Sequence, residues 1–111
     1  MKTEQPILIT SIKCALNTGI EKHRFVGFDG NYGADGYKSL GVANADTSLN
    51  EMIPVVSKGI AIVKTIGAIP LGSAVKAFDD GLASAWDAGP VEGYALEAAS
   101  GSDELIRVLL S

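Results

Sequence analysis

The chain has 111 residues, of which 47% are hydrophobic and 20% are charged, so it is long enough for one globular domain with its own core. Its formal net charge is −4 at pH 7, and the largest basic cluster is the short segment EKHR. Such a surface repels phosphate backbones and anionic lipid, which argues against nucleic-acid and membrane partners. Cys14 is the one cysteine, which excludes an internal disulfide and a thiolate metal cluster.

The short, mainly polar start of the chain predicts an N-terminal arm over residues 1–6, followed by a single β domain over residues 7–111. The opening segment MKTEQPILIT lacks the apolar region and cleavage site of a signal peptide. The most apolar stretch, GIAIVKTIGAIPLGSAV, contains Lys64 and Pro70 and is too short to span a bilayer. We therefore expect synthesis in a cytoplasm.

Short predicted strands follow the arm. PILITSIKCAL is rich in β-branched residues and predicts the first strand. HRFVGFDGN predicts a second strand that runs into a hairpin turn at Asp29-Gly30, and NYGADGYKS predicts a loop. LGVANAD and EMIPVVS predict a strand pair in which Pro54 marks an edge or a bulge, because proline cannot donate a backbone hydrogen bond.

The second half of the chain continues in the same manner. GIAIVKTI predicts a strand, and PLGSAVKAFDDGLASAW predicts a turn, another strand and a hairpin turn at Asp80-Gly81. EGYALEA and ELIRVLL predict the closing strand pair. No window has a sustained period of 3.6 residues. Seven to nine short strands with this spacing predict an all-β fold, either a small β-barrel or a β-sandwich.

Two segments of the chain share a pattern of glycine, alanine, glutamate and β-branched residues. Six identities relate them: Gly41, Ala43, Ala45, Glu51, Ile53 and Val55 match Gly93, Ala95, Ala98, Glu104, Ile106 and Val108. A Phe-Asp-Gly or Phe-Asp-Asp-Gly turn precedes each segment. The pattern favours an internal duplication with pseudo-twofold symmetry and halves at about 7–57 and 58–111. The alternative is that hairpin proteins share such features without duplication.

The sequence predicts no catalytic residue, no cofactor and no metal site. His23 is the one histidine and lies between cations, where an exposed position is expected. The loop DGNYGADG lacks the Gly-Lys-Ser/Thr ending of a phosphate-binding loop. The segments GADG and DDG lack the alternating ligands and terminal glutamate of a calcium loop. A chain without convergent reactive groups is expected to act by binding a surface.

Four residues are candidates for such an interface: Ile7, Leu8, Ile9 and Trp86. The first three belong to the apolar segment that follows the arm. Trp86 lies among small residues in ASAWDAGP, and tryptophan is enriched at protein interfaces, although burial in the core is the alternative.

Three segments within residues 36–111 resemble those of the capsid cement, or decoration, proteins of tailed phages. In chain order they are LGVANADTSLNEMIPVVSKGIAIV, IPLGSAVKAFDDGLA and EGYALEAASGSDELIRVLL. Phage head-fibre proteins share the character of the last segment. The alternatives are a β-rich protein- or carbohydrate-binding module, or a small β subunit of a larger complex.

The resemblance implies a non-enzymatic structural protein of a virion. Such a protein would bind the outside of the capsid and stabilise the expanded head by bridging capsomers. The implied partner is the phage major capsid protein, and the implied state is a homotrimer made in the host cytoplasm. The arm MKTEQPILI would be ordered on the capsid, since such arms can add a strand to the sheet edge of a neighbour.

Overall fold

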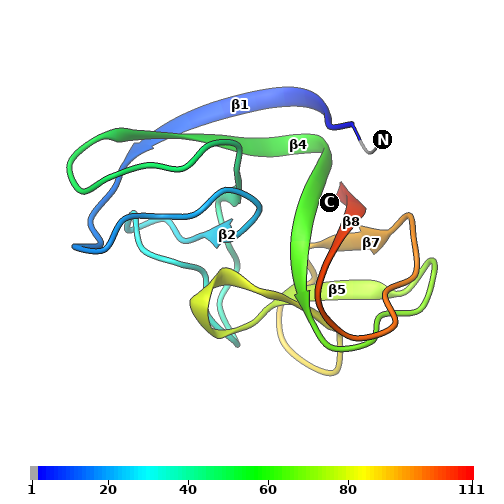
Figure 1. The fold of residues 1–111 in the computed structure, drawn as a ribbon. Coiled ribbons are helices and arrows are strands. Elements are labelled where there is room, and N and C mark those ends of the chain that lie inside the picture. The colour runs from blue at the N-terminus through cyan, green and yellow to red at the C-terminus, as the bar shows by residue number, and fades with distance from the viewer. Residues whose placement is uncertain (1–2) are drawn as a thin grey trace.

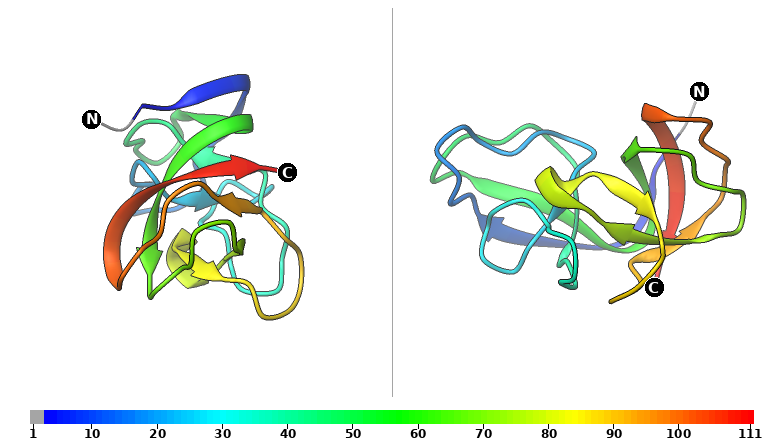
Figure 2. Two further views of the ribbon diagram at one scale, coloured as in Figure 1. Left: turned by 90° about the vertical axis from the view of Figure 1, so that its right-hand side faces the viewer. Right: turned by 90° about the horizontal axis from the view of Figure 1, so that it is seen from below.

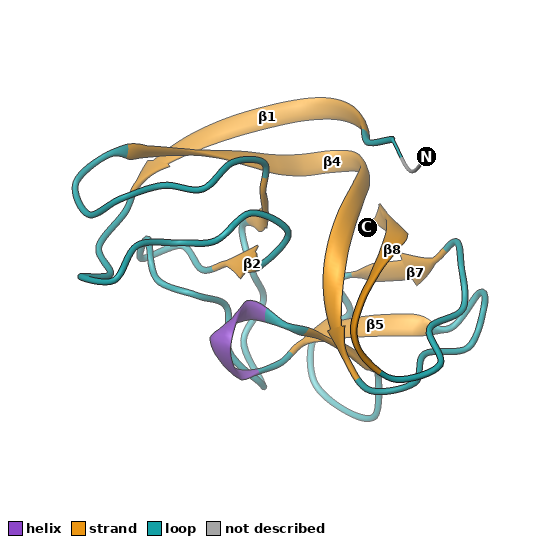
Figure 3. Cartoon of the chain, in the orientation of Figure 1, coloured by secondary structure: helices purple, strands orange, loops and turns teal. Residues whose placement is uncertain are grey.

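In the computed structural model, which describes residues 3–111, backbone hydrogen bonds join eight strands into one sheet (Figure 3). The strands are β1 (Gln5–Lys13), β2 (Phe25–Val26), β3 (Gly41–Ala43), β4 (Met52–Ile66), β5 (Ala74–Ala77), β6 (Ala83–Ala85), β7 (Gly93–Ala95) and β8 (Ser102–Leu110), with a short 3-10 turn η1 (Asp79–Gly81) after β5. The predicted all-β fold is confirmed. Met1 and Lys2 of the predicted arm lie outside the described residues, and β1 already begins at Gln5.

Five of the strands close into a barrel. Along the sheet the order is β4-β6-β5-β7-β8, and β8 pairs with β4 to complete the ring. The strands β2 and β3 extend the sheet from β4, and β1 pairs with β4 across the top of the molecule (Figure 1). The structure therefore confirms the small β-barrel, with three further strands outside the ring.

The long strand β4 connects the barrel to the outer strands. The sequence predicted two strands here, EMIPVVS and GIAIVKTI, whereas the structure has one strand of 15 residues. Its first half pairs with β1 and β3 and its second half with β8, and it bends sharply between them (Figure 1). Gly59 lies at this point with a φ of +101°, and a Cβ there would lie 2.4 Å from the backbone oxygen of Gln5. Glycine is therefore required where β1 crosses.

Two groups of buried side chains form the core. The larger one is mainly aliphatic and includes Phe25, Val63 and Ile106, which fill the barrel and the space beside it. The smaller one lies beneath β1 and the first half of β4 and includes Cys14, Ile20 and Ile53. No helix in the described residues is long and apolar enough to cross a bilayer.

Backbone contacts recur in the two halves of the chain. Three hydrogen bonds in the first half each have a counterpart in the second half. The bond from His23 N to Ala43 O corresponds to that from Gly72 N to Ala95 O, and the bond from Leu40 N to Val26 O corresponds to that from Glu92 N to Val75 O. The bond from Asn44 N to Pro54 O corresponds to that from Leu96 N to Arg107 O. Isolated bridges also match, with Ile20 opposite Thr47 and Ile69 opposite Ala99. These pairs support the internal duplication. The boundaries at 7–57 and 58–111 stay a prediction, and β4 runs across them.

The glycine that opens β3 and the one that opens β7 have the same environment. A Cβ at Gly41 would lie 2.2 Å from the backbone oxygen of Val56, and a Cβ at Gly93 would lie 2.3 Å from that of Leu109. Each glycine therefore lets a neighbouring backbone approach closely, which explains its place in the repeat.

Replacing Gly93 by alanine is expected to lower the free energy of unfolding by about 1–3 kcal/mol, because the added methyl group meets backbone atoms that cannot move independently. Gly101→Ala is the matched control, since the nearest atom to a Cβ there is the Glu104 carboxylate at 3.9 Å. Denaturant unfolding followed by circular dichroism measures both. Equal stability of the two variants would contradict the close approach of the Leu109 backbone oxygen to Gly93.

Candidate interaction surfaces

The outer edge of β1 is the first candidate surface. Within the described chain β1 pairs with β4 alone, so its other edge presents backbone groups to solvent. Three consecutive apolar residues lie on this strand, with Ile7 83% exposed, Leu8 50% and Ile9 48%. A long edge strand with exposed apolar side chains is a template for pairing with another chain.

Local irregularity explains why these side chains are exposed. The pairing with β4 shifts register between Pro6 and Leu8 and again between Leu8 and Ile9. Further along β1, Ile12 is half-buried against the smaller core cluster. The first five residues of β1 are all exposed, so this part of the strand is held mainly by backbone hydrogen bonds and adds little to the core.

A row of side chains continues from β1 across the outside of the barrel. Gln5 pairs with Ile60 of β4, Ile60 with Leu109 of β8, and Leu109 with Tyr94 of β7. Neighbours in register point to the same face of a sheet. Leu109 is 45% exposed and Tyr94 is 47% exposed, so the row forms a partly apolar ridge beside the N-terminal end of β1.

The structure does not bring Trp86 together with the other three interface candidates. Trp86 follows β6 and is 45% exposed, and its indole N–H donates a hydrogen bond to Gly89 O at 2.9 Å. The loop that carries it lies at the bottom of the view in which β1 lies along the top (Figure 1). Trp86 belongs to neither core cluster, and its part in an interface stays a prediction.

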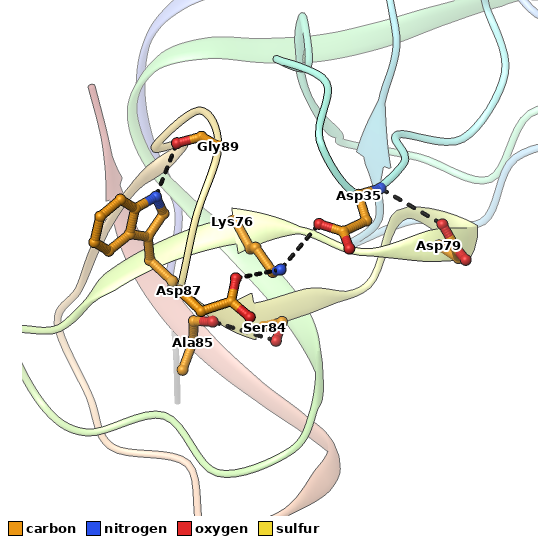
Figure 4. A network of polar contacts seen from close by, with 8 residues as sticks. Asp35, Lys76, Asp79, Ser84, Ala85, Asp87 and Gly89 are labelled. Carbon is orange, nitrogen blue, oxygen red and sulfur yellow. Dashed lines mark hydrogen bonds and ion pairs between the residues drawn. The ribbon is translucent and has the colours of Figure 1, made fainter.

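A buried lysine anchors the loops below the barrel. Lys76 of β5 donates to Asp35 at 2.9 Å and to Asp87 at 2.5 Å, and Asp35 N donates to the Asp79 carboxylate at 3.5 Å (Figure 4). The hydrogen bond to Asp87, followed by that to Asp35, raises the pKa of Lys76. The same bond lowers the pKa of Asp87. The network joins three loops that are distant in the sequence.

Acidification is expected to weaken this network. Because the pKa of Asp87 is lower in the folded chain than its unfolded value of about 3.9, its contribution is present above that value and is lost as the pH falls through the folded pKa. In Lys76→Met the hydrogen bond that lowers the Asp87 pKa most is absent. The fall in melting temperature from about pH 5 to about pH 3 should therefore be smaller in Lys76→Met than in the wild type.

Lys64→Met is the matched control for that measurement. Lys64 lies 3.8 Å from Asp103 in an exposed pair, so its loss should leave the acid dependence of the wild type in place. Thermal unfolding followed by circular dichroism at both pH values gives the comparison. If Lys76→Met lost as much stability in acid as the wild type, the Lys76–Asp87 pair would not couple to folding.

A buried glutamate holds the loop between β2 and β3. Glu92 is 2% exposed and accepts hydrogen bonds from Lys38 Nζ at 2.8 Å and from Ser39 N at 2.7 Å. The loop borders a cavity of about 410 Å³ whose lining includes Phe28 and Tyr37. The sequence predicts only a hairpin turn and a loop for this segment, whereas in the structure Phe28 and Tyr37 line the same cavity.

The single histidine is half-buried, which differs from the exposed position that its charged neighbours predicted. His23 lies beside β4 with a φ of +71°, and its Nδ1 is 3.2 Å from Ile62 O. Burial, and next the charge of Lys22, lowers its pKa. In residues 3–111 no three His, Cys, Asp or Glu side chains gather in a way that could hold a metal ion.

The free edge of β1, with its exposed apolar side chains, is a surface to which another chain could add a strand. The model of the phage cement protein family matches residues 5–110, and the chain belongs to this family. It is therefore a capsid-associated structural protein of a phage, as the sequence resemblance indicated.

The fold is similar to that of a known head-fibre domain. The crystal structure of the N-terminal base of head fibre gp8.5 of bacteriophage phi29 matches with a TM-score of 0.76 and 18% sequence identity, over 94% of this chain and 95% of that chain. At this identity the likeness shows the fold alone. Among curated proteins, none matches the chain in sequence.

Proposed function

We propose that the chain binds the outside of a phage capsid and stabilises the expanded head by bridging neighbouring capsomers, without catalysing a reaction. The free edge of β1 with its exposed Ile7, Leu8 and Ile9, in a member of the phage cement family, is the observation that supports this function. A ligand that binds only the expanded shell stabilises that shell by mass action. Contacts repeated over a symmetric lattice add their effects.

The proposed occupant of the β1 edge is an extended segment of the major capsid protein. Adding a strand satisfies the free backbone groups of β1, and side-chain contacts with Ile7, Leu8 and Ile9 supply specificity. Lys13 and Lys58 are exposed on β1 and on the paired part of β4, so a complementary segment is apolar with an acidic residue. If the segment came from a second copy of this chain, it would instead place that copy's own lysines next to Lys13 and Lys58.

The proposed state in solution and on the head is a homotrimer, made in the host cytoplasm and added to the outer capsid surface. The ridge of Ile60, Leu109 and Tyr94 is the proposed contact between copies, because it is partly apolar and lies beside the β1 edge. Light scattering during size-exclusion chromatography should give about three times the chain mass of 11.5 kDa. A mass of one chain would reject the preformed trimer.

Co-sedimentation with heads tests the function itself. The purified chain is mixed with undecorated expanded heads and, in parallel, with unexpanded heads of the same phage, and the pelleted protein is quantified. Saturable binding to expanded heads, with little binding to unexpanded heads, is expected. Failure to pellet with expanded heads would reject capsid binding, and equal binding to both forms would reject selective stabilisation of the expanded state.

A further inference from the structure

The cavity beside the loop between β2 and β3 has features of a ligand site. Phe28 is 66% exposed and Tyr37 is 75% exposed, which makes them the most exposed aromatic side chains in residues 3–111, and both line the cavity. Tyr32 lines it as well. Exposed aromatic rings scattered singly need no explanation, but two that border one cavity of about 410 Å³ form a binding platform.

The walls of the cavity are held by hydrogen bonds and ion pairs. The Tyr32 hydroxyl accepts a hydrogen bond from Glu21 N at 3.0 Å, and Arg24 lies 5.4 Å from the centre of its ring. On the other side of the loop, Lys38 and Ser39 are tied to the buried Glu92. Such a loop is organised before a ligand arrives, which lowers the entropy cost of binding.

The polar groups that line the cavity can make further hydrogen bonds. The Asp29 carboxylate accepts hydrogen bonds from Asn31, which lower its pKa, and its oxygens have capacity for further donors. Lys38 contributes one ammonium group with a side chain that is 46% exposed. Ser39 is 2% exposed, and its hydroxyl has no hydrogen-bond partner within residues 3–111. The Lys38 ammonium already pairs with Glu92, so the described lining of the cavity holds no unpaired cation.

We propose that this cavity binds a neutral saccharide, with a sugar ring stacked on Tyr37 or Phe28 and its hydroxyl groups bonded to Asp29 and Lys38. Sugar rings combine apolar C–H faces with hydroxyl groups around the rim. Aromatic platforms flanked by hydrogen-bonding groups of both kinds match that chemistry. An anionic ligand would face the Asp29 carboxylate with no free cation in the lining to offset the repulsion.

The position of the cavity fits a ligand outside the virion. The loop of residues 33–38 lies at the bottom of the view in which β1 lies along the top (Figure 1), and seen from below it lies in front of β1 (Figure 2). If β1 faces the capsid, as the proposed function has it, this loop faces solvent. Only this placement rests on the proposed function, and the saccharide site itself does not.

Saturation-transfer-difference NMR on the full chain tests the site. The probes are the trisaccharides triacetylchitotriose, cellotriose and maltotriose at millimolar concentration. At least one should receive saturation from the protein. Tyr37→Ala and Phe28→Ala should each weaken the affinity about tenfold, whereas Tyr37→Phe keeps the ring and should retain binding. Leu71→Ala is the control, because Leu71 is 69% exposed in the turn between β4 and β5 and does not line the cavity.

Two outcomes would overturn the proposal: no transfer to any of the three trisaccharides, or equal transfer with Tyr37→Ala and the wild type. Binding of a proline-rich peptide in place of the sugars would assign the cavity to a peptide and would also overturn it. Tyr37→Ala should pellet with expanded heads as the wild type does, so failure of the saccharide site is distinguishable from failure of capsid binding.

Discussion

Replacing Phe25 by alanine is expected to lower the free energy of unfolding by about 3–5 kcal/mol. Phe25 is fully buried in the larger core cluster and is the largest fully buried side chain of the described residues. It lies on β2 opposite Val42, and Gly33 packs against its Cβ from the neighbouring loop. Since a domain of this size is stable by only about 5–15 kcal/mol, this loss is a large fraction of the total stability.

Phe28→Ala provides a matched control within the same segment. Its ring is 66% exposed, so its removal should change stability by less than about 0.5 kcal/mol. Urea unfolding of both variants, followed by circular dichroism, gives the two free energies. Similar losses in Phe25→Ala and Phe28→Ala would contradict the core that the structure assigns to β2.

The double variant Ile7→Asp, Ile9→Asp is expected to lose binding to expanded heads by at least about thirtyfold. Both side chains are exposed in the free chain, at 83% and 48%, so the fold should persist. At the proposed interface each aspartate would have to leave water without a partner of opposite charge, which is costly. Co-sedimentation over a range of protein concentrations measures the change.

Leu71→Asp is the control for that double variant. Leu71 is an apolar residue exposed to 69% in the turn between β4 and β5, outside the β1 edge. Leu71→Asp adds one negative charge, against two in the double variant, and should bind heads as the wild type does. Wild-type binding by the β1 double variant, or equal losses in both variants, would remove β1 from the interface.

Local sequence signals predicted much of the fold. Alternation of Ile106 and Val108 with exposed neighbours gave the closing strand, since one face of β8 is buried and the other is not. The repeated Gly-x-Ala segments became β3 and β7, with the same close contact at Gly41 and Gly93. These features depend on neighbours within a few residues and on one buried face, which a pattern can report.

Features that depend on two covered faces or on distant contacts were not predictable. Both alternations in β4 are largely apolar because its middle part is packed on both sides, so the pattern did not reveal one continuous strand. The Lys76 network joins Asp35 and Asp87, which lie far from each other in the sequence. No local signal indicated that Phe28 and Tyr37 would border one cavity.

Among the interface residues, too, some are visible as a local sequence pattern and others are adjacent only in the folded chain. The apolar run Ile7–Ile9 is visible in the sequence, and the structure shows that it is exposed on an edge strand. The ridge of Leu109 and Tyr94 was missed, because its members come from two strands and are adjacent only through pairing. Trp86 is indicated by its residue type, yet the loop that carries it, after β6, lies away from β1 (Figure 1).

The most direct test of the cementing function is the disassembly temperature of expanded heads, measured by light scattering as the protein is titrated. The disassembly temperature should rise with added wild-type chain and reach a plateau when the sites are filled, because the ligand binds the intact shell and is released on disassembly. The Ile7→Asp, Ile9→Asp variant should give no rise at the same concentrations. A disassembly temperature that stays constant while wild-type protein saturates the heads would contradict the stabilising role.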